Sequence, residues 1–158
     1  TYMELGGSEY YRIKGFLGKN VPKVRLKEAK RSVRAITRAI DKGYIRACHD
    51  LSEGGLAVAA AEMAFAGGYG LEIWLKNVPA ADDLRRNDYI LFSESNSRFL
   101  VEVSEKYRGA FESTVKGAYH ALIGRVRSDD SFIVYGLNGD PVIQTDIEKL
   151  LNSWRKPL

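Results

Sequence analysis

The secondary structure of residues 56–66 is constrained more strongly than that of any other segment in this sequence. The segment is rich in alanine and lies between two glycine pairs. Alanine has the highest intrinsic helix propensity, and glycine pairs interrupt helices. A helix with such small side chains can also lie close to a neighbouring sheet. The segment therefore predicts a buried helix that begins after Gly54-Gly55, ends near Gly67-Gly68 and packs Ala60 against a sheet.

Hydrophobic periodicity predicts the other elements. Apolar residues three and four positions apart predict a helix over residues 26–40, with Gly43 at its C-terminal cap. Residues 105–116 also have a helical pattern, and a last amphipathic helix is expected after Thr145, which would cap it. Strands are expected at 9–14, 45–48, 71–75, 90–92, 99–103, 119–126 and 132–135, with a polar connection at 78–87, a hairpin turn at Asp129-Asp130 and a turn at Asn138-Gly139.

The order of these elements indicates the fold class. Strands and helices do not alternate strictly, which favours an α+β fold: a mixed β-sheet with helices packed on one face. A chain of 158 residues is expected to form a single domain. Its 45% apolar and 28% charged residues are typical of a globular protein and exclude a disordered chain.

Several functional classes receive no support from the residues. No apolar run is long enough to cross a membrane, and the N-terminus lacks a signal-peptide pattern. Cys48 is the only cysteine, so neither an internal disulfide nor a thiol metal cluster can form, and we expect a cytoplasmic protein. His49 and His120 lack metal-ligand spacing and nucleophile partners. No catalytic residue and no metal site are therefore predicted.

The first candidate ligand site is the turn between the strand at 45–48 and the alanine-rich helix. Gly54 and Gly55 allow a ligand to approach the backbone closely, and the N–H groups at a helix start attract anions. Asp50 or Ser52 could cap the helix. A tight, well-capped turn without a ligand explains the same residues.

The second candidate site is the polar segment at residues 93–98. Its hydroxyl groups and terminal arginine suit a phosphate or sugar ligand. A solvated hairpin turn is the alternative, although such turns usually contain glycine or proline. The candidate residues of this segment are Ser93, Glu94, Ser95 and Arg98.

The third feature is a basic face on the predicted helix at 26–40. The net charge of the whole chain is only +4, and neither aromatic interleaving nor a groove-reading motif accompanies the face. We therefore expect a solvated face or a surface for docking a partner, and no nucleic-acid binding. The basic residues are Lys27, Lys30, Arg31, Arg34 and Arg38.

Three motifs together resemble the large-subunit family of phosphoribosylformylglycinamidine synthases. The first is residues 49–58 followed by Ala61-Glu62, the second is residues 91–95 followed by residues 97–99, and the third is residues 4–10. Residues 142–154 look like the end of that subunit. The resemblance implies a domain of the aminoimidazole ribonucleotide synthetase C-terminal type, occupying residues 15–158 after a lead-in segment, residues 1–14, from an ATP-binding domain.

The resemblance also implies a function for the longer protein. That family makes formylglycinamidine ribonucleotide from formylglycinamide ribonucleotide, ATP and glutamine-derived ammonia, with Mg²⁺, for purine biosynthesis. Its partners are a glutaminase subunit and a small accessory subunit. The catalytic histidine and the acidic metal ligands of the family belong to ATP-binding domains, so this chain alone is expected to be inactive and to bind no cofactor tightly.

The large subunit of this family consists of two similar halves. The Ser-Glu-Gly-Gly form of the first motif resembles the motif in the C-terminal domain of the second half. The two candidate sites would then form an auxiliary phosphate or nucleotide site made of Asp50, Ser52, Gly54, Gly55, Ser93, Glu94, Ser95 and Arg98. The alternatives are a domain of aminoimidazole ribonucleotide synthetase, a domain of a related ATP-dependent kinase, or a free-standing ligand-binding protein.

Overall fold

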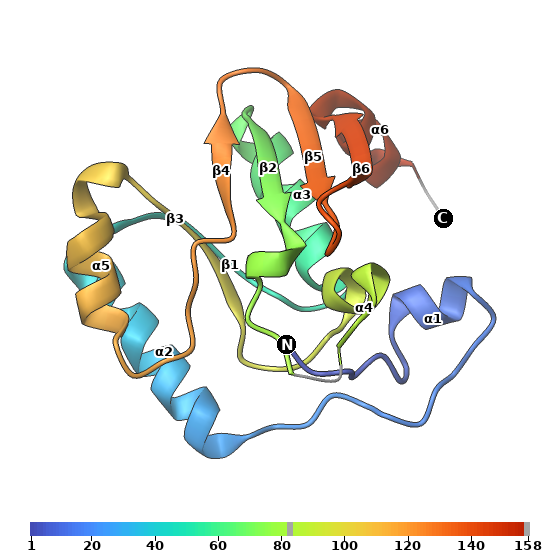
Figure 1. The fold of residues 1–158 in the computed structure, drawn as a ribbon, viewed down its shortest axis with the longest axis horizontal. Helices are drawn as coiled ribbons and strands as arrows, with labels where there is room; N and C mark the ends of the chain where they lie inside the picture. The colour runs from blue at the N-terminus through green and yellow to red at the C-terminus, as the bar shows by residue number, and fades with distance from the viewer. Residues whose placement is uncertain (82–83, 157–158) are drawn as a thin grey trace.

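The computed structural model describes residues 1–81 and 84–156, which build two sheets with helices around them (Figure 1). The larger sheet is mixed and has the strand order β4-β2-β5-β6, where β2 and β5 are parallel and the other neighbours are antiparallel. Its strands are β2 (Gly70–Trp74), β4 (Gly124–Arg127), β5 (Ser131–Tyr135) and β6 (Pro141–Asp146).

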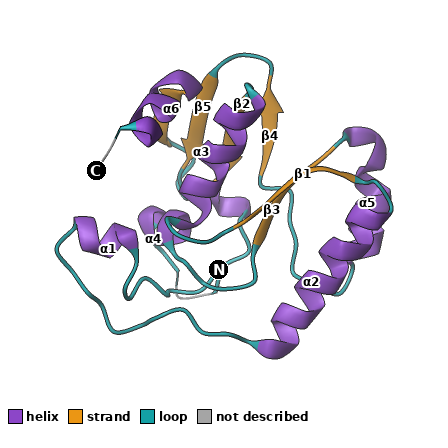
Figure 2. Ribbon diagram, turned by 180° about the vertical axis from the view of Figure 1, so that it is seen from behind, coloured by secondary structure: helices purple, strands orange, loops and turns teal. Residues whose placement is uncertain are grey.

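The alanine-rich segment forms α3 (Gly55–Gly67), which covers one face of this sheet together with α6 (Ile147–Arg155) (Figure 2). Ala59 and Ala60 are buried against Ile73 and Val134 of the sheet. This arrangement confirms the predicted α+β fold with helices on one face of a mixed sheet. It also confirms that Ala60 lies in the core.

A smaller sheet and a helix pair form the other side of the molecule. The strands β1 (Ile45–Asp50) and β3 (Phe99–Val103) are antiparallel. The helix α2 (Leu26–Asp41) packs on α5 (Arg108–Val115), which follows the short 3₁₀ helix η2 (Glu105–Tyr107). Their contact buries Ala35, Ala39 and Val115. The predicted helix at 26–40 and the role of Gly43, whose φ is +69° just beyond the helix, are confirmed.

Two segments predicted as strands are helices. The first is α1 (Glu9–Ile13), because the Ser8 hydroxyl accepts a hydrogen bond from the Tyr11 N–H and caps the turn. The second is α4 (Asn87–Phe92), which follows the 3₁₀ helix η1 (Leu75–Asn77). Both segments are short and aromatic, so their composition favoured strands, whereas local capping and helical hydrogen bonds determine the structure.

The predicted hairpin of residues 119–126 and 132–135 is wrong. The strand β2 lies between β4 and β5, and β4 is shorter than predicted. Gly124 allows β4 to approach the β2 backbone at Glu72, and the Glu72 carboxylate pairs with Arg125 and Arg127 of β4. These contacts attach β4 to β2 rather than to β5.

Several smaller expectations were also corrected or confirmed. The strand β6 was not predicted, and α6 is capped by Asp146, whose side chain accepts a hydrogen bond from the Lys149 N–H, rather than by Thr145. The Asn138-Gly139 turn is confirmed by the Gly139 N–H, which donates to the Gly136 carbonyl. β1 is half-buried along one face. Residues 82–83 of the predicted connection lie outside the described residues.

Among the described residues, no helix has both the length and the apolar character that a membrane crossing needs.

Candidate anion site

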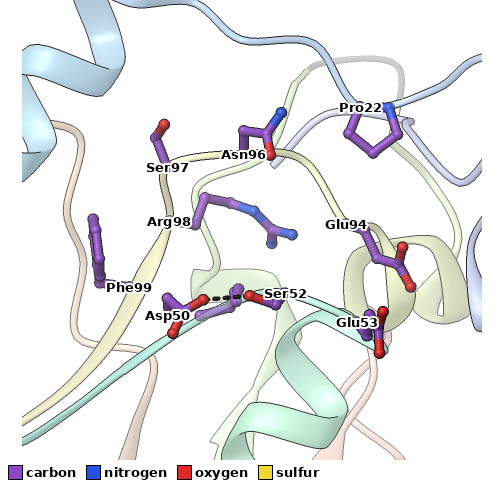
Figure 3. A pocket seen from close by; sticks show the side chains of 10 residues that line it. Pro22, Asp50, Ser52, Glu53, Glu94, Asn96, Ser97, Arg98 and Phe99 are labelled. Atoms are coloured by element: carbon purple, nitrogen blue, oxygen red, sulfur yellow. Dashed lines mark hydrogen bonds between the residues drawn. The ribbon is translucent and has the colours of Figure 1, made fainter.

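A cavity of about 520 Å³ lies where the turn after β1 faces the loop between α4 and β3 (Figure 3). Both candidate segments therefore contribute to one cavity, although they are far apart in the sequence. Four predicted site residues line it: Asp50, Ser52, Glu94 and Arg98. The cavity is also lined by Pro22, Leu51, Glu53, Asn96, Ser97 and Phe99, which are not among the predicted site residues.

The glycine pair determines how the turn after β1 meets the loop. Gly54 is the N-cap of α3 with φ +74°, and neither Asp50 nor Ser52 caps the helix as expected. The Ser52 hydroxyl instead donates to the Asp50 carboxylate, which holds the pKa of Asp50 below its usual value. Gly55 has φ +61°, and a Cβ there would overlap the Ser93 carbonyl oxygen. The loop after α4 therefore packs directly on the backbone of this turn.

The Glu94 carboxylate binds the N-terminal ends of two helices. Its Oε1 accepts the Gly54 N–H at 2.9 Å and the Glu9 N–H at 3.3 Å. A negative charge is stabilised at such positions by free N–H groups and the helix dipole. The Gly54 N–H predicted to bind an external anion is therefore already bound by a carboxylate of the same chain.

Ser93 and Ser95 are buried and hold the N-terminal segment instead of facing the cavity. The Ser93 hydroxyl donates to the Tyr2 carbonyl at 2.6 Å, and the Ser95 hydroxyl accepts the Tyr2 N–H at 3.3 Å. The Glu94 N–H donates to the Glu4 carbonyl at 3.2 Å. The conformation of this loop is thus set by its contacts with the first residues of the chain.

Arg98 is the positively charged group of the cavity wall, and Figure 3 shows its guanidinium among the lining side chains. Its Nε donates to the Ser95 carbonyl at 2.8 Å, its Nη1 to the Thr1 hydroxyl at 3.2 Å, and its Nη2 to the Ser93 carbonyl. Burial lowers the pKa of Arg98 to about 10, so it is charged at neutral pH.

The Arg98 guanidinium has capacity for an additional acceptor. Arginine has five N–H donors, and the three hydrogen bonds above use only three of them. Within residues 1–81 and 84–156, no carboxylate forms a salt bridge with Arg98. Arg98 is partly buried and has no direct ion pair, although Glu4 and Glu94 stabilise its charge from a longer distance. Partial burial of a charge without a direct ion pair is costly, and an anion in the cavity would reduce that cost. Asp50, Glu53 and Glu94 in the wall limit how strongly the anion binds.

Neither histidine lines the cavity. The His49 Nε2 lies 3.1 Å from the Glu62 Oε2 on α3, and the His120 Nδ1 lies 2.9 Å from the Ala118 carbonyl. Among the described residues, no three His, Cys, Asp or Glu side chains are arranged to hold a metal ion. Ser97, the only non-glycine described with positive φ, also lines the cavity, and nothing in the sequence indicated that conformation.

A family model for the C-terminal domain of AIR synthase related proteins matches residues 3–136. The chain belongs to this family. Two members to which it is similar are phosphoribosylformylglycinamidine synthase subunits PurL. The chain is 38% identical to the PurL of Thermococcus sibiricus over 95% of its own length, and 38% identical to that of Moorella thermoacetica over 100% of it. These matches confirm the resemblance indicated by the three motifs.

Two solved structures have a similar fold. The structure of T. maritima PurL complexed with FGAR matches 83% of the chain with a TM-score of 0.75 and 20% identity, and the match covers 22% of that chain. A chain of the HypE-HypF complex matches 71% of the present chain with a TM-score of 0.60 and 17% identity. The match covers 40% of the chain in that complex. The chain spans about a fifth of the length of the PurL relatives, 20% and 21% in the two named above.

Proposed function

We propose that this chain is the AIR synthase-type C-terminal domain of a phosphoribosylformylglycinamidine synthase large subunit. The supporting observation is its similarity to PurL subunits along nearly its whole length, over only a fifth of theirs. Residues 1–14 would lead in from a preceding ATP-binding domain, and residues 15–158 would form the domain itself. The PurL names of the relatives favour this assignment over an aminoimidazole ribonucleotide synthetase, a related kinase or a free-standing binding protein.

The proposal gives the longer protein a cytoplasmic, ATP- and Mg²⁺-dependent ligase activity in purine biosynthesis, with glutamine as the amido donor. Its partners would be the preceding domains of the same subunit, a glutaminase subunit and a small accessory subunit. The structure titled PurLQS of Thermotoga maritima is consistent with such a complex. This chain would supply no catalytic residue. It would supply architecture and the anion site around Arg98.

A chimera tests the assignment. Replacing the matched segment of Moorella thermoacetica PurL with this chain is expected to retain synthesis of formylglycinamidine ribonucleotide from ATP, ammonia and Mg²⁺, because the domain is similar along its full length. The chain alone is expected to show only the background rate. A correctly folded but inactive chimera, or turnover by the chain alone, would contradict the proposal.

Anion binding at Arg98 can be tested separately. Calorimetry with inorganic phosphate and with ADP is expected to give millimolar or weaker affinity, about 4 kcal/mol, since the cavity is open and partly acidic. Arg98→Met should abolish the binding, because it removes the positive charge in the wall. Arg46→Met is the matched control, because Arg46 is exposed and lies outside the cavity. If both variants lose phosphate and ADP binding equally, the binding reflects a nonspecific effect of positive charge instead.

A further inference from the structure

The helix α2 has three different faces, of which only one is packed. The packed face consists of small residues, with Ala35 and Ala39 buried against α5. The other two faces are an apolar stripe and a basic face. Figures 1 and 2 show α2 at the edge of the molecule with α5 beside it. The apolar stripe thus lies on a different face from the buried alanines.

Three residues of the apolar stripe are exposed, one in each third of the helix, whereas Ala29 and Ile36 are partly buried. Leu26, Val33 and Ile40 are 78%, 48% and 50% exposed. They are seven residues apart, with Ala29 and Ile36 between them at the positions that complete a heptad pattern. This spacing of apolar residues is the one with which an α-helix binds a second α-helix. Contiguous exposed apolar surface of this kind marks interaction sites in proteins.

The open side of the stripe is bordered by basic residues without counterions. Lys30 and Arg34 are nearest to it, and the face continues through Lys27, Arg31 and Arg38. Within residues 1–81 and 84–156, none of these five forms a salt bridge with a carboxylate. Other arginines of the same chain are paired, as Arg86 is with Asp88 and Arg127 with Asp129. The uncompensated charge is therefore concentrated beside the exposed stripe.

We propose that α2 is the docking surface for an amphipathic helix of a separate protein subunit, with an apolar stripe bordered by Asp or Glu. Such a partner would bury Leu26, Val33 and Ile40 and neutralise Lys30 and Arg34 in one interface. A second copy of this chain would place basic faces close together. Nucleic acid would leave the apolar stripe uncovered. The stripe has no aromatic residue of the kind that anchors interfacial membrane helices.

The experiment uses two synthetic helical peptides of about three heptads with Leu at the a and d positions. One peptide has Glu at the flanking e and g positions, and the other has Lys there. The Glu peptide is expected to bind the protein, and the Lys peptide to bind at least about tenfold more weakly, because the open side of the stripe is basic. Titration monitored by fluorescence anisotropy of labelled peptides measures both affinities.

Variants test the location of binding. Val33→Lys is expected to weaken the Glu peptide about tenfold or more, whereas Val142→Lys should leave it unchanged. These two valines have similar exposure, 48% and 42%, but Val142 lies on β6. The double variant Lys30→Glu/Arg34→Glu is expected to reverse the preference, so that the Lys peptide binds more tightly. That reversal is not expected from a general loss of stability.

Other outcomes would overturn the proposal. Failure of the Glu peptide to bind, or equal binding of both peptides, would do so. A concentration-dependent dimer in sedimentation experiments that disappears in Val33→Lys would assign the stripe to a second copy. Tighter binding of duplex DNA, or of vesicles containing phosphatidylserine, that is lost in Lys30→Glu/Arg34→Glu would assign the basic face to that ligand.

Discussion

Gly55→Ala is expected to cost about 2–5 kcal/mol of the free energy of unfolding, which combines overpacking with a strained backbone. The new Cβ would overlap the Ser93 carbonyl oxygen and lie 2.8 Å from that of Leu91, and both of these are backbone atoms. The residue would also retain a φ of +61°, which is unfavourable for any side chain. Urea unfolding followed by circular dichroism measures the loss.

Gly68→Ala is the matched control for that experiment. Gly68 has φ +69° at the other end of α3, but a Cβ there would meet nothing within 4 Å. Its cost is expected to be the backbone strain alone, about 1–2 kcal/mol. Similar losses for the two variants would mean that the close contact between Gly55 and the loop after α4 contributes nothing to stability.

Glu4→Gln is expected to destabilise the protein by about 1–3 kcal/mol, because it removes a buried charge that has specific partners. Glu4 is 1% exposed, and its Oε1 lies 2.7 Å from the Arg25 Nη2. Its other carboxylate oxygen accepts the Lys23 N–H at 3.3 Å. The partner Arg25 is partly exposed and stacks on Tyr2, so solvent reduces the loss below that of a fully buried pair.

Glu9→Gln provides the comparison, because Glu9 and Arg12 form an exposed pair that should contribute less than about 1 kcal/mol. A double-mutant cycle of Glu4→Gln with Arg25→Met isolates the pair itself. Coupling near zero would show that the loss in Glu4→Gln comes from the carboxamide rather than from the broken ion pair. Thermal unfolding at several salt concentrations distinguishes the buried pair from the exposed one, since salt screens exposed charges more strongly.

The sequence predicted the elements whose pattern is long or chemically extreme. The alanine-rich α3 and the periodic α2 were located almost to the residue, because helix propensity and glycine stops act locally. The strands predicted at the positions of α1 and α4 were wrong, because each of these helices is too short for its periodicity to be recognised in the sequence. The pairing of β2 with β5 could not be predicted, since it depends on contacts between residues distant in the sequence.

Of the eight predicted site residues, four line the cavity, and the arrangement of the others was not predicted. Both segments line one cavity, as a shared ligand site requires, and Arg98 is its positive group. The roles of Glu94 and Ser93 were not visible, because they depend on where the N-terminal residues lie. Polar side chains in a loop look alike in a sequence whether they bind a ligand or satisfy backbone groups of the same chain.

The position of β2 between β4 and β5 has a consequence for how the protein is made. Leu71 pairs with Phe132, so the centre of the sheet forms only after a long loop has closed, and such non-local pairing slows folding. During synthesis β2 leaves the ribosome well before either neighbour, and both of its edges stay unpaired meanwhile. An exposed strand edge of this kind attracts other chains. Nascent chains that stall before β5 therefore expose an unpaired edge of β2, and we expect them to associate with other chains more readily than the complete domain.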